Sequence, residues 1–197
     1  MHKIAKMYPE QPLLGGVARA ESTLDEQGRI IHLTPFNRFT YGNYGQIPDE
    51  LYNKIKSLFS KVAALVEKEN IKQDLWEKYS YISALAGLTT LFRGTVGDIR
   101  DTPGGLDWFR RAFTETAEVI RHAGGQLADD LVDRYMKGIP DMLPDSTSSM
   151  HRDMQKGLPT EHDMHGYLVE LAHDHGVQAP LLEVIFQNLE IYENKRR

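Results

Sequence analysis

The chain has 197 residues, of which 41% are hydrophobic and 26% charged, and its formal net charge is −5. This composition is typical of a soluble globular protein, and the negative charge argues against a duplex nucleic-acid binder, which needs a basic face. The absence of cysteine excludes a disulfide framework, a thiolate nucleophile and a cysteine zinc site.

The N-terminal residues, MHKIAKMYPEQ, lack the apolar core of a secretory signal. The longest mostly apolar stretch, residues 82–92, is too short to span a bilayer. A protein without cysteine also suits a reducing compartment. We therefore expect a cytoplasmic protein that associates with neither membrane nor nucleic acid.

Residues 1–46 are predicted to be rich in strands. Short runs of β-branched, aromatic and other apolar residues stand at 13–18, 29–33 and 39–42, and the sequence Asp25–Gly28 between the first two indicates a turn. We expect two or three short antiparallel strands here. Such a fragment is too small to be stable by itself and needs another element to pack on.

Residues 47–197 are predicted to form an all-helical part of six or seven helices. Apolar spacing predicts an amphipathic helix over 51–66, and Pro48 suits the residue that opens it. A second helix is expected over 74–92, with Asp74 as its N-cap, before a glycine-rich loop over 94–105. Glycine and proline separate further helices, which are expected over 106–120, 127–136, 149–156, 161–176 and 180–192.

Lys78 is the unusual residue of the second helix. Helical spacing puts it on one stripe with Ile82, Leu85 and Ala86, which are apolar. A lysine on a core-facing stripe costs energy unless it is paired or faces a cleft. Two interpretations stay open at this point: Lys78 extends its ammonium group to solvent along the apolar surface, or it faces a functional cleft.

Other candidate residues also have two interpretations. The cluster 146–149 resembles a helix start, and Glu161 suits the first turn of a helix, where a carboxylate complements the helix dipole. Alternatively, Ser149 and Glu161 face the same cleft as Lys78. The histidines at 162, 165, 173 and 175 lack the HExxH pattern and an obvious third ligand, so we expect solvated or capping histidines and no metal site.

Three motifs in order resemble the C-terminal half of the ketopantoate reductases (2-dehydropantoate 2-reductases). They are W-x-K at Trp76–Lys78, S-S-M-x-x-D at Ser148–Asp153 and T-E-x-D at Thr160–Asp163, and Val96–Gly97–Asp98 lies between the first two. The similarity extends over about residues 72–192. Residues 13–42 are similar to the last strands of that family's nucleotide-binding domain.

This resemblance implies a fold and a chemistry. The fold would be mainly α: a 6-phosphogluconate dehydrogenase C-terminal-like helical domain after a short antiparallel β remnant of a truncated Rossmann domain. Family members reduce a 2-oxo acid of pantothenate biosynthesis with NADP(H), in a site between their two domains. By resemblance, Lys78 is the catalytic proton donor, Ser148 and Ser149 bind the substrate, and Glu161 binds the nicotinamide–ribose end of the cofactor.

Two departures from the family pattern restrict this expectation. The family carries asparagines four and eight residues after the lysine, where this chain has Ile82 and Ala86, so the identity of the 2-oxo acid stays open. No G-x-G-x-x-G fingerprint is present. We therefore expect the chain to be inactive and to bind NADP(H) weakly without a separate N-terminal Rossmann segment. We also expect a homodimer, and the alternative function is a non-catalytic helical dimerisation or partner-binding module.

Overall fold

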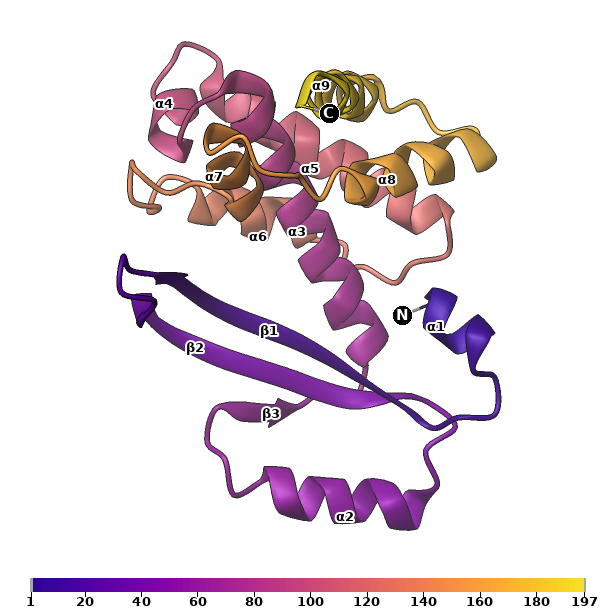
Figure 1. Ribbon diagram of the computed structural model, residues 1–197. Coiled ribbons are helices and arrows are strands. Elements are labelled where there is room, and N and C mark those ends of the chain that lie inside the picture. The colour runs from indigo at the N-terminus through magenta and orange to yellow at the C-terminus, as the bar shows by residue number, and fades with distance from the viewer. Residues whose placement is uncertain (1, 197) are drawn as a thin grey trace. The chain divides into compact units, whose positions relative to one another are not determined.

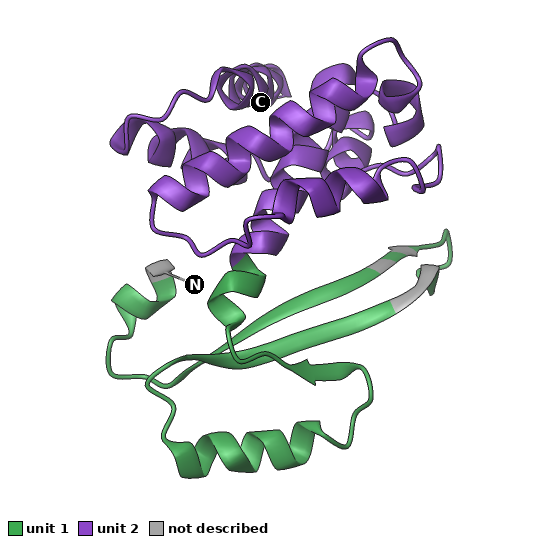
Figure 2. Ribbon diagram, turned by 180° about the vertical axis from the view of Figure 1, so that it is seen from behind, with its two compact units in different colours: residues 1–75 green, residues 76–197 purple. Residues whose placement is uncertain are grey.

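The computed structural model describes residues 2–196, apart from the side chains of residues 2, 3, 21, 23 and 33–36. The chain divides into two compact units, one through Leu75 and one from Trp76 onward (Figure 2). The first unit contains a three-stranded sheet, and the second is helical. The expected fold class, a mainly α protein with a small β part, is therefore confirmed.

The first unit is built on a long antiparallel hairpin. Strand β1 (Leu13–Leu24) pairs with β2 (Ile30–Gly45), and the predicted turn joins them, with Gly28 at φ 76° (Figure 1). The Asp25 carboxylate closes the turn, because its Oδ1 accepts from the backbone N–H groups of Gln27 and Arg29 at 2.9 and 2.8 Å. Helix α1 (His2–Met7), which the sequence did not predict, precedes the hairpin.

The helix expected over 51–66 is shorter than its apolar spacing suggests. Helix α2 (Asp49–Phe59) ends early, and strand β3 (Leu65–Glu67) follows and pairs in parallel with β2. Backbone hydrogen bonds on either side of β3 support the pairing, from Phe39 N to Ala64 O and from Lys68 N to Tyr41 O. Pairing with β2 therefore outweighs the helical periodicity. The compact unit that contains the sheet continues past β3 to Leu75.

Helix α3 (Ile71–Phe92) begins earlier than expected, and Asp74 is not its N-cap. Asn70 has that role instead, because its Oδ1 accepts from Gln73 N at 3.1 Å. The Asp74 carboxylate binds the guanidinium group of Arg19 and the hydroxyl of Thr40 within the same unit. Burial alone would raise the pKa of Asp74, but these hydrogen bonds outweigh it and hold the pKa below its ordinary value.

The second unit packs its helices around α3 and α5. The long helices correspond to the expected ones, since their apolar spacing is regular. Its buried core includes Phe109, Phe113 and Ile120 of α5 and Leu189 of α9. The helices after α3 are α4 (Val96–Arg100), α5 (Gly105–His122), α6 (Leu131–Gly138), α7 (Ser149–Gln155), α8 (Asp163–Asp174) and α9 (Pro180–Arg196) (Figure 1).

Helix α4 lies where a loop was expected. Thr95 accepts from Asp98 N at 3.1 Å, and the Asp98 carboxylate accepts from Thr95 N at 2.8 Å, which makes a complete capping box. These reciprocal bonds stabilise a helix too short to show an apolar period. None of the helices in the described part of the chain combines the length and apolarity that crossing a membrane requires.

Candidate functional site

The candidate site begins on one face of α3. Lys78 is half-buried on this helix, and Ile82 and Thr89 follow it on the same stripe at helical spacing. Ala86, eight residues after Lys78, borders the stripe and is only 5% exposed. The face therefore changes from a cationic residue to apolar residues and ends in a buried hydroxyl about 16 Å further along the axis.

The hydroxyl of Thr89 connects α3 to the start of α7. Thr89 Oγ1 lies 2.8 Å from Ser148 Oγ and donates to the carbonyl of Leu85 at 2.9 Å. Since the Thr89 proton is used within its helix, Ser148 is the donor in the Thr89–Ser148 pair. Ser148 is also the N-cap of α7, because its Oγ accepts from His151 N at 3.0 Å.

The two candidate serines therefore differ in their surroundings. Ser148 uses its proton on Thr89 and a lone pair on the His151 N–H group, which fixes the start of α7. Ser149, the first residue of α7, is exposed. Of the two hydroxyls, that of Ser149 is the better placed to receive a ligand.

His151 is a site residue that sequence reasoning did not identify. Its ring is buried, and its Nδ1 lies 2.6 Å from Thr147 Oγ1. Burial lowers the pKa of His151, and the positive charge of Arg93 lowers it further; Asp98 opposes this shift, and Arg152 adds the smallest lowering effect. The ring is therefore neutral at physiological pH, and its Nε2 is buried without a hydrogen-bond partner. The S-S-M-x-x-D motif spans this residue, but its spacing does not indicate burial.

The Val96–Gly97–Asp98 sequence holds the loop that leads to Ser148. Val96 N–H donates to Ser146 O at 2.7 Å, and Gly97 N–H donates to Pro144 O at 2.9 Å. A side chain at Gly97 would put a Cβ only 2.6 Å from Pro144 O, so this close approach requires glycine. The resemblance named this motif, and the structure shows that it supports the start of α7.

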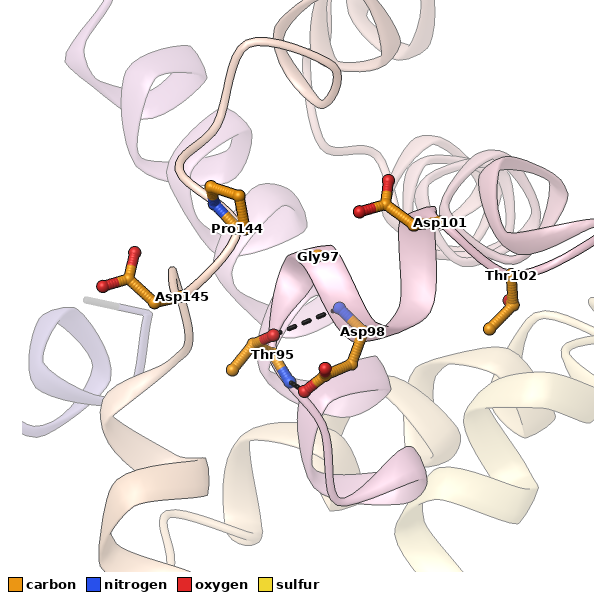
Figure 3. A pocket seen from close by; sticks show the side chains of 7 residues that line it. All are labelled: Thr95, Gly97, Asp98, Asp101, Thr102, Pro144 and Asp145. Carbon is orange, nitrogen blue, oxygen red and sulfur yellow. Dashed lines mark hydrogen bonds between the residues drawn. The ribbon is translucent and has the colours of Figure 1, made fainter.

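An open pocket of about 500 Å³ lies beside this loop. Figure 3 shows its lining, which consists of Thr95, Gly97, Asp98, Asp101, Thr102, Pro144 and Asp145. Hydrogen bonds from Thr95 lower the pKa of Asp98, and those from Arg100 lower the pKa of Asp101. An acidic lining repels a carboxylate, so this pocket does not suit an organic acid.

Glu161 lies in the segment between α7 and α8. The helix expected from Glu161 begins instead at Asp163, so Glu161 precedes it and its side chain is exposed. Its neighbour Thr160 is buried. Within the described residues, no hydrogen bond or ion pair joins Ser149 to Glu161, and each stands at the approach to a different helix.

His165 differs from the expectation of solvated or capping histidines, whereas His173 and His175 are exposed. His165 is wholly buried, with its Nε2 2.8 Å from the carbonyl of Ser83. Burial lowers its pKa to about 4. The ring packs against Gly87, where an added Cβ would lie 2.9 Å from Nε2. Among the residues described, histidines and carboxylates form no group of three or more that could hold a metal ion.

A family model described as the C terminal part of ketopantoate reductase PanE/ApbA matches residues 70–193. The "Uncharacterized oxidoreductase YkpB" of Bacillus subtilis (strain 168) is 34% identical over 191 residues, which are 96% of this chain and 63% of that protein. A 2-dehydropantoate 2-reductase of Mycobacterium tuberculosis is 32% identical over 112 residues, or 56% of this chain and 37% of that enzyme.

Solved structures have the same fold. The 2-dehydropantoate 2-reductase from Methylococcus capsulatus has a TM-score of 0.82 and 25% identity, and the match covers 98% of this chain and 62% of that one. A dimeric ketopantoate reductase from Staphylococcus aureus also has a TM-score of 0.82, with 18% identity over 98% of this chain and 65% of its own. This chain therefore spans less than two thirds of the length of these relatives.

Proposed function

Because the chain belongs to the ketopantoate reductase PanE/ApbA family, we propose that it forms the C-terminal part of an NADPH-dependent reductase of 2-oxo acids. The observation that carries this proposal is the α3 face, on which half-buried Lys78 leads to the Thr89–Ser148 bond at the start of α7. The proposed product is the corresponding 2-hydroxy acid.

Each proposed residue has one task in the reaction. NADPH, when bound, supplies a hydride to the carbonyl carbon of the 2-oxo acid, and the carbonyl oxygen becomes an alkoxide. The Lys78 ammonium group stabilises this negative charge and transfers a proton to the oxygen, which completes the hydroxyl group. The Ser149 hydroxyl donates a hydrogen bond to the substrate carboxylate, and Ser148 holds the start of α7 in place.

Glu161 suits the cofactor's ribose. Its carboxylate is exposed and accepts hydrogen bonds, and ribose hydroxyls are donors. The chain carries no glycine fingerprint for the pyrophosphate, which we assign to a separate Rossmann segment.

The proposed substrate has an apolar side chain. Ile82 and Ala86 follow Lys78 on α3, and neither offers a hydrogen-bonding group. A substrate hydroxyl buried against them would lose its hydrogen bonds to water without replacement. The chain therefore favours a 2-oxo acid with an aliphatic or aromatic side chain over ketopantoate, which carries a hydroxyl.

The experiment compares two proteins: the chain alone, and the chain fused behind the N-terminal residues of the Bacillus relative that precede the match. We expect a panel of 2-oxo acids to be reduced only by the fusion, as followed by NADPH absorbance. Lys78→Ala should lower turnover by about 10²–10⁴-fold. Lys72→Ala, which removes an exposed lysine of the same helix, is the matched control. Turnover that survives Lys78→Ala, or micromolar binding of NADPH to the chain alone, contradicts the proposal.

Exposed apolar side chains favour a second role in assembly. Val184 and Ile191 of α9 are 54% and 47% exposed, and Phe92 contacts the partly exposed Trp108 edge to face. Such side chains are common in homodimer interfaces. We propose that the chain is a homodimer, and sedimentation at several concentrations tests this. If the fusion dimerises but reduces no 2-oxo acid, the non-catalytic module is the better description.

A further inference from the structure

Glu193 of α9 holds the residue that precedes Glu161. Its side chain is only 4% exposed, and its Oε1 accepts from the backbone N–H of Thr160 at 2.7 Å and from the Thr160 hydroxyl at 2.9 Å. Its Oε2 accepts from the Nε and terminal nitrogen of Arg196 at 3.1 and 2.7 Å. The buried carboxylate is thus fully paired, as burial of a charge requires.

Two further residues of α9 bind the same segment. Glu190 Oε1 lies 3.3 Å from Nε2 of His162, the residue that follows Glu161. The Tyr192 hydroxyl donates to Leu158 O at 2.7 Å. Helix α9 therefore contacts the chain on both sides of Glu161, while the Glu161 side chain is exposed.

These contacts from α9 fix the backbone of the segment between α7 and α8. Residues 157–162 form no helix or strand, and such connections move unless side chains tie them down. A ligand contact made by Glu161 needs a fixed backbone, because a displacement of one ångström weakens catalysis strongly. The carboxylate of Glu193 supplies that fixation through the backbone of Thr160.

We propose that Glu193 is a positioning residue: through Thr160 it holds Glu161 where the carboxylate can bind the cofactor. This inference rests on the proposed function. Glu193 itself touches neither cofactor nor substrate. Thr160 has the matching role, since its N–H and hydroxyl are the two groups that Glu193 binds.

The first test is amide hydrogen exchange in the 197-residue chain. In Glu193→Ala, exchange at Thr160 and its neighbours should become at least about tenfold faster, because the amide loses its acceptor. Amides in the middle of α5 should keep their rates. Glu183→Gln, an exposed glutamate in the first turn of α9, is the control and should change nothing near Thr160. An unchanged exchange rate at Thr160 overturns the proposed positioning role of Glu193.

The second test is kinetic and uses the fusion with the Rossmann segment. Glu193→Gln and Thr160→Val should raise the KM for NADPH by about tenfold or more and leave the KM for the 2-oxo acid unchanged. Because Glu193 acts through Glu161, Glu193→Gln should add nothing to the KM of a Glu161→Gln variant. If the effects of Glu193→Gln and Glu161→Gln on the KM for NADPH add fully in the double variant, Glu193 has only a structural role. A parent fusion without reductase activity defeats the proposed function, whereas an active parent with unchanged KM for NADPH in Glu193→Gln defeats this inference alone.

Discussion

The Arg19 guanidinium on β1 makes two hydrogen bonds to the Asp74 carboxylate in the first turns of α3, at 2.8 and 3.0 Å. The strand hairpin thus holds the beginning of the helix that carries Lys78 further along. Thr40 donates a third hydrogen bond to the same carboxylate. The pairing explains why Asp74 is buried although it is not a cap.

Arg19→Ala should destabilise the chain by about 1–3 kcal/mol, since it leaves the buried Asp74 without its counter-charge. Urea unfolding at neutral pH measures the change in unfolding free energy. Arg38→Ala, an exposed arginine of β2, is the matched control. The hydrogen bonds lower the pKa of Asp74, so the contribution is present above the ordinary pKa of an aspartate and is lost as the pH falls through the lowered value. If Arg19→Ala lowers the unfolding free energy no more than Arg38→Ala does, the Arg19–Asp74 pair contributes nothing to stability.

His165 also makes the stability of the fold depend on pH, because its buried ring is kept neutral rather than charged. Its pKa in the folded chain is about 4, below the ordinary value of 6.5, so between these values the unfolded chain binds a proton that the folded chain does not. Stability should therefore fall as the pH is lowered from 6.5 to 4, by up to about 1.4 kcal/mol per pH unit for this one group. His165→Phe fills the same space and should remove that slope.

The measurement is the unfolding free energy at pH values from 7 to 4, for the parent and His165→Phe. His173→Phe, on the exposed face of the same helix, is the control and should keep the parent slope. A slope that persists in His165→Phe would assign the proton uptake to other groups.

The long helices were predictable because each repeats its apolar residues over many turns, as α5 does with Phe109, Phe113 and Ile120. Strand β3 was not, because its residues continue the helical spacing of α2 and only the partner strand decides their state. Helix α4 is too short to show a period, although its T-x-x-D capping sequence was visible.

In the candidate site, too, some residues could be predicted from the sequence and others could not. Motifs made Lys78, Ser149 and Glu161 candidates, because a family resemblance is carried by residue types at fixed positions. The contacts that hold the site together join residues far apart in the chain: Thr89 and Ser148 are 59 positions apart, and Thr160 and Glu193 are 33 apart. No spacing rule reaches such distances, so these supporting residues appear only in the folded chain.

Ile82→Asn tests the origin of substrate choice. An asparagine here adds an amide one turn from Lys78, and we expect kcat/KM for ketopantoate, relative to a 2-oxo acid with an apolar side chain, to rise by about 10–100-fold in the fusion. Ile82→Leu keeps the side chain apolar and should leave the ratio unchanged. An unchanged ratio in Ile82→Asn would remove Ile82 from the determinants of specificity.

Thr89→Val tests the connection between α3 and α7. Valine has nearly the shape of threonine but no hydroxyl, so Ser148 loses its acceptor and the start of α7 loses its tie to α3. We expect a loss of about 1–2 kcal/mol in unfolding free energy. In the fusion, the KM for the 2-oxo acid should rise while that for NADPH stays constant, because Ser149 follows Ser148 directly. Thr89→Ser keeps the hydroxyl and should keep the parent values of the unfolding free energy and of the KM for the 2-oxo acid. In a Ser148→Ala background the loss from Thr89→Val should largely disappear, since the bond is already absent; a full loss there would mean that Thr89 acts through its own helix alone.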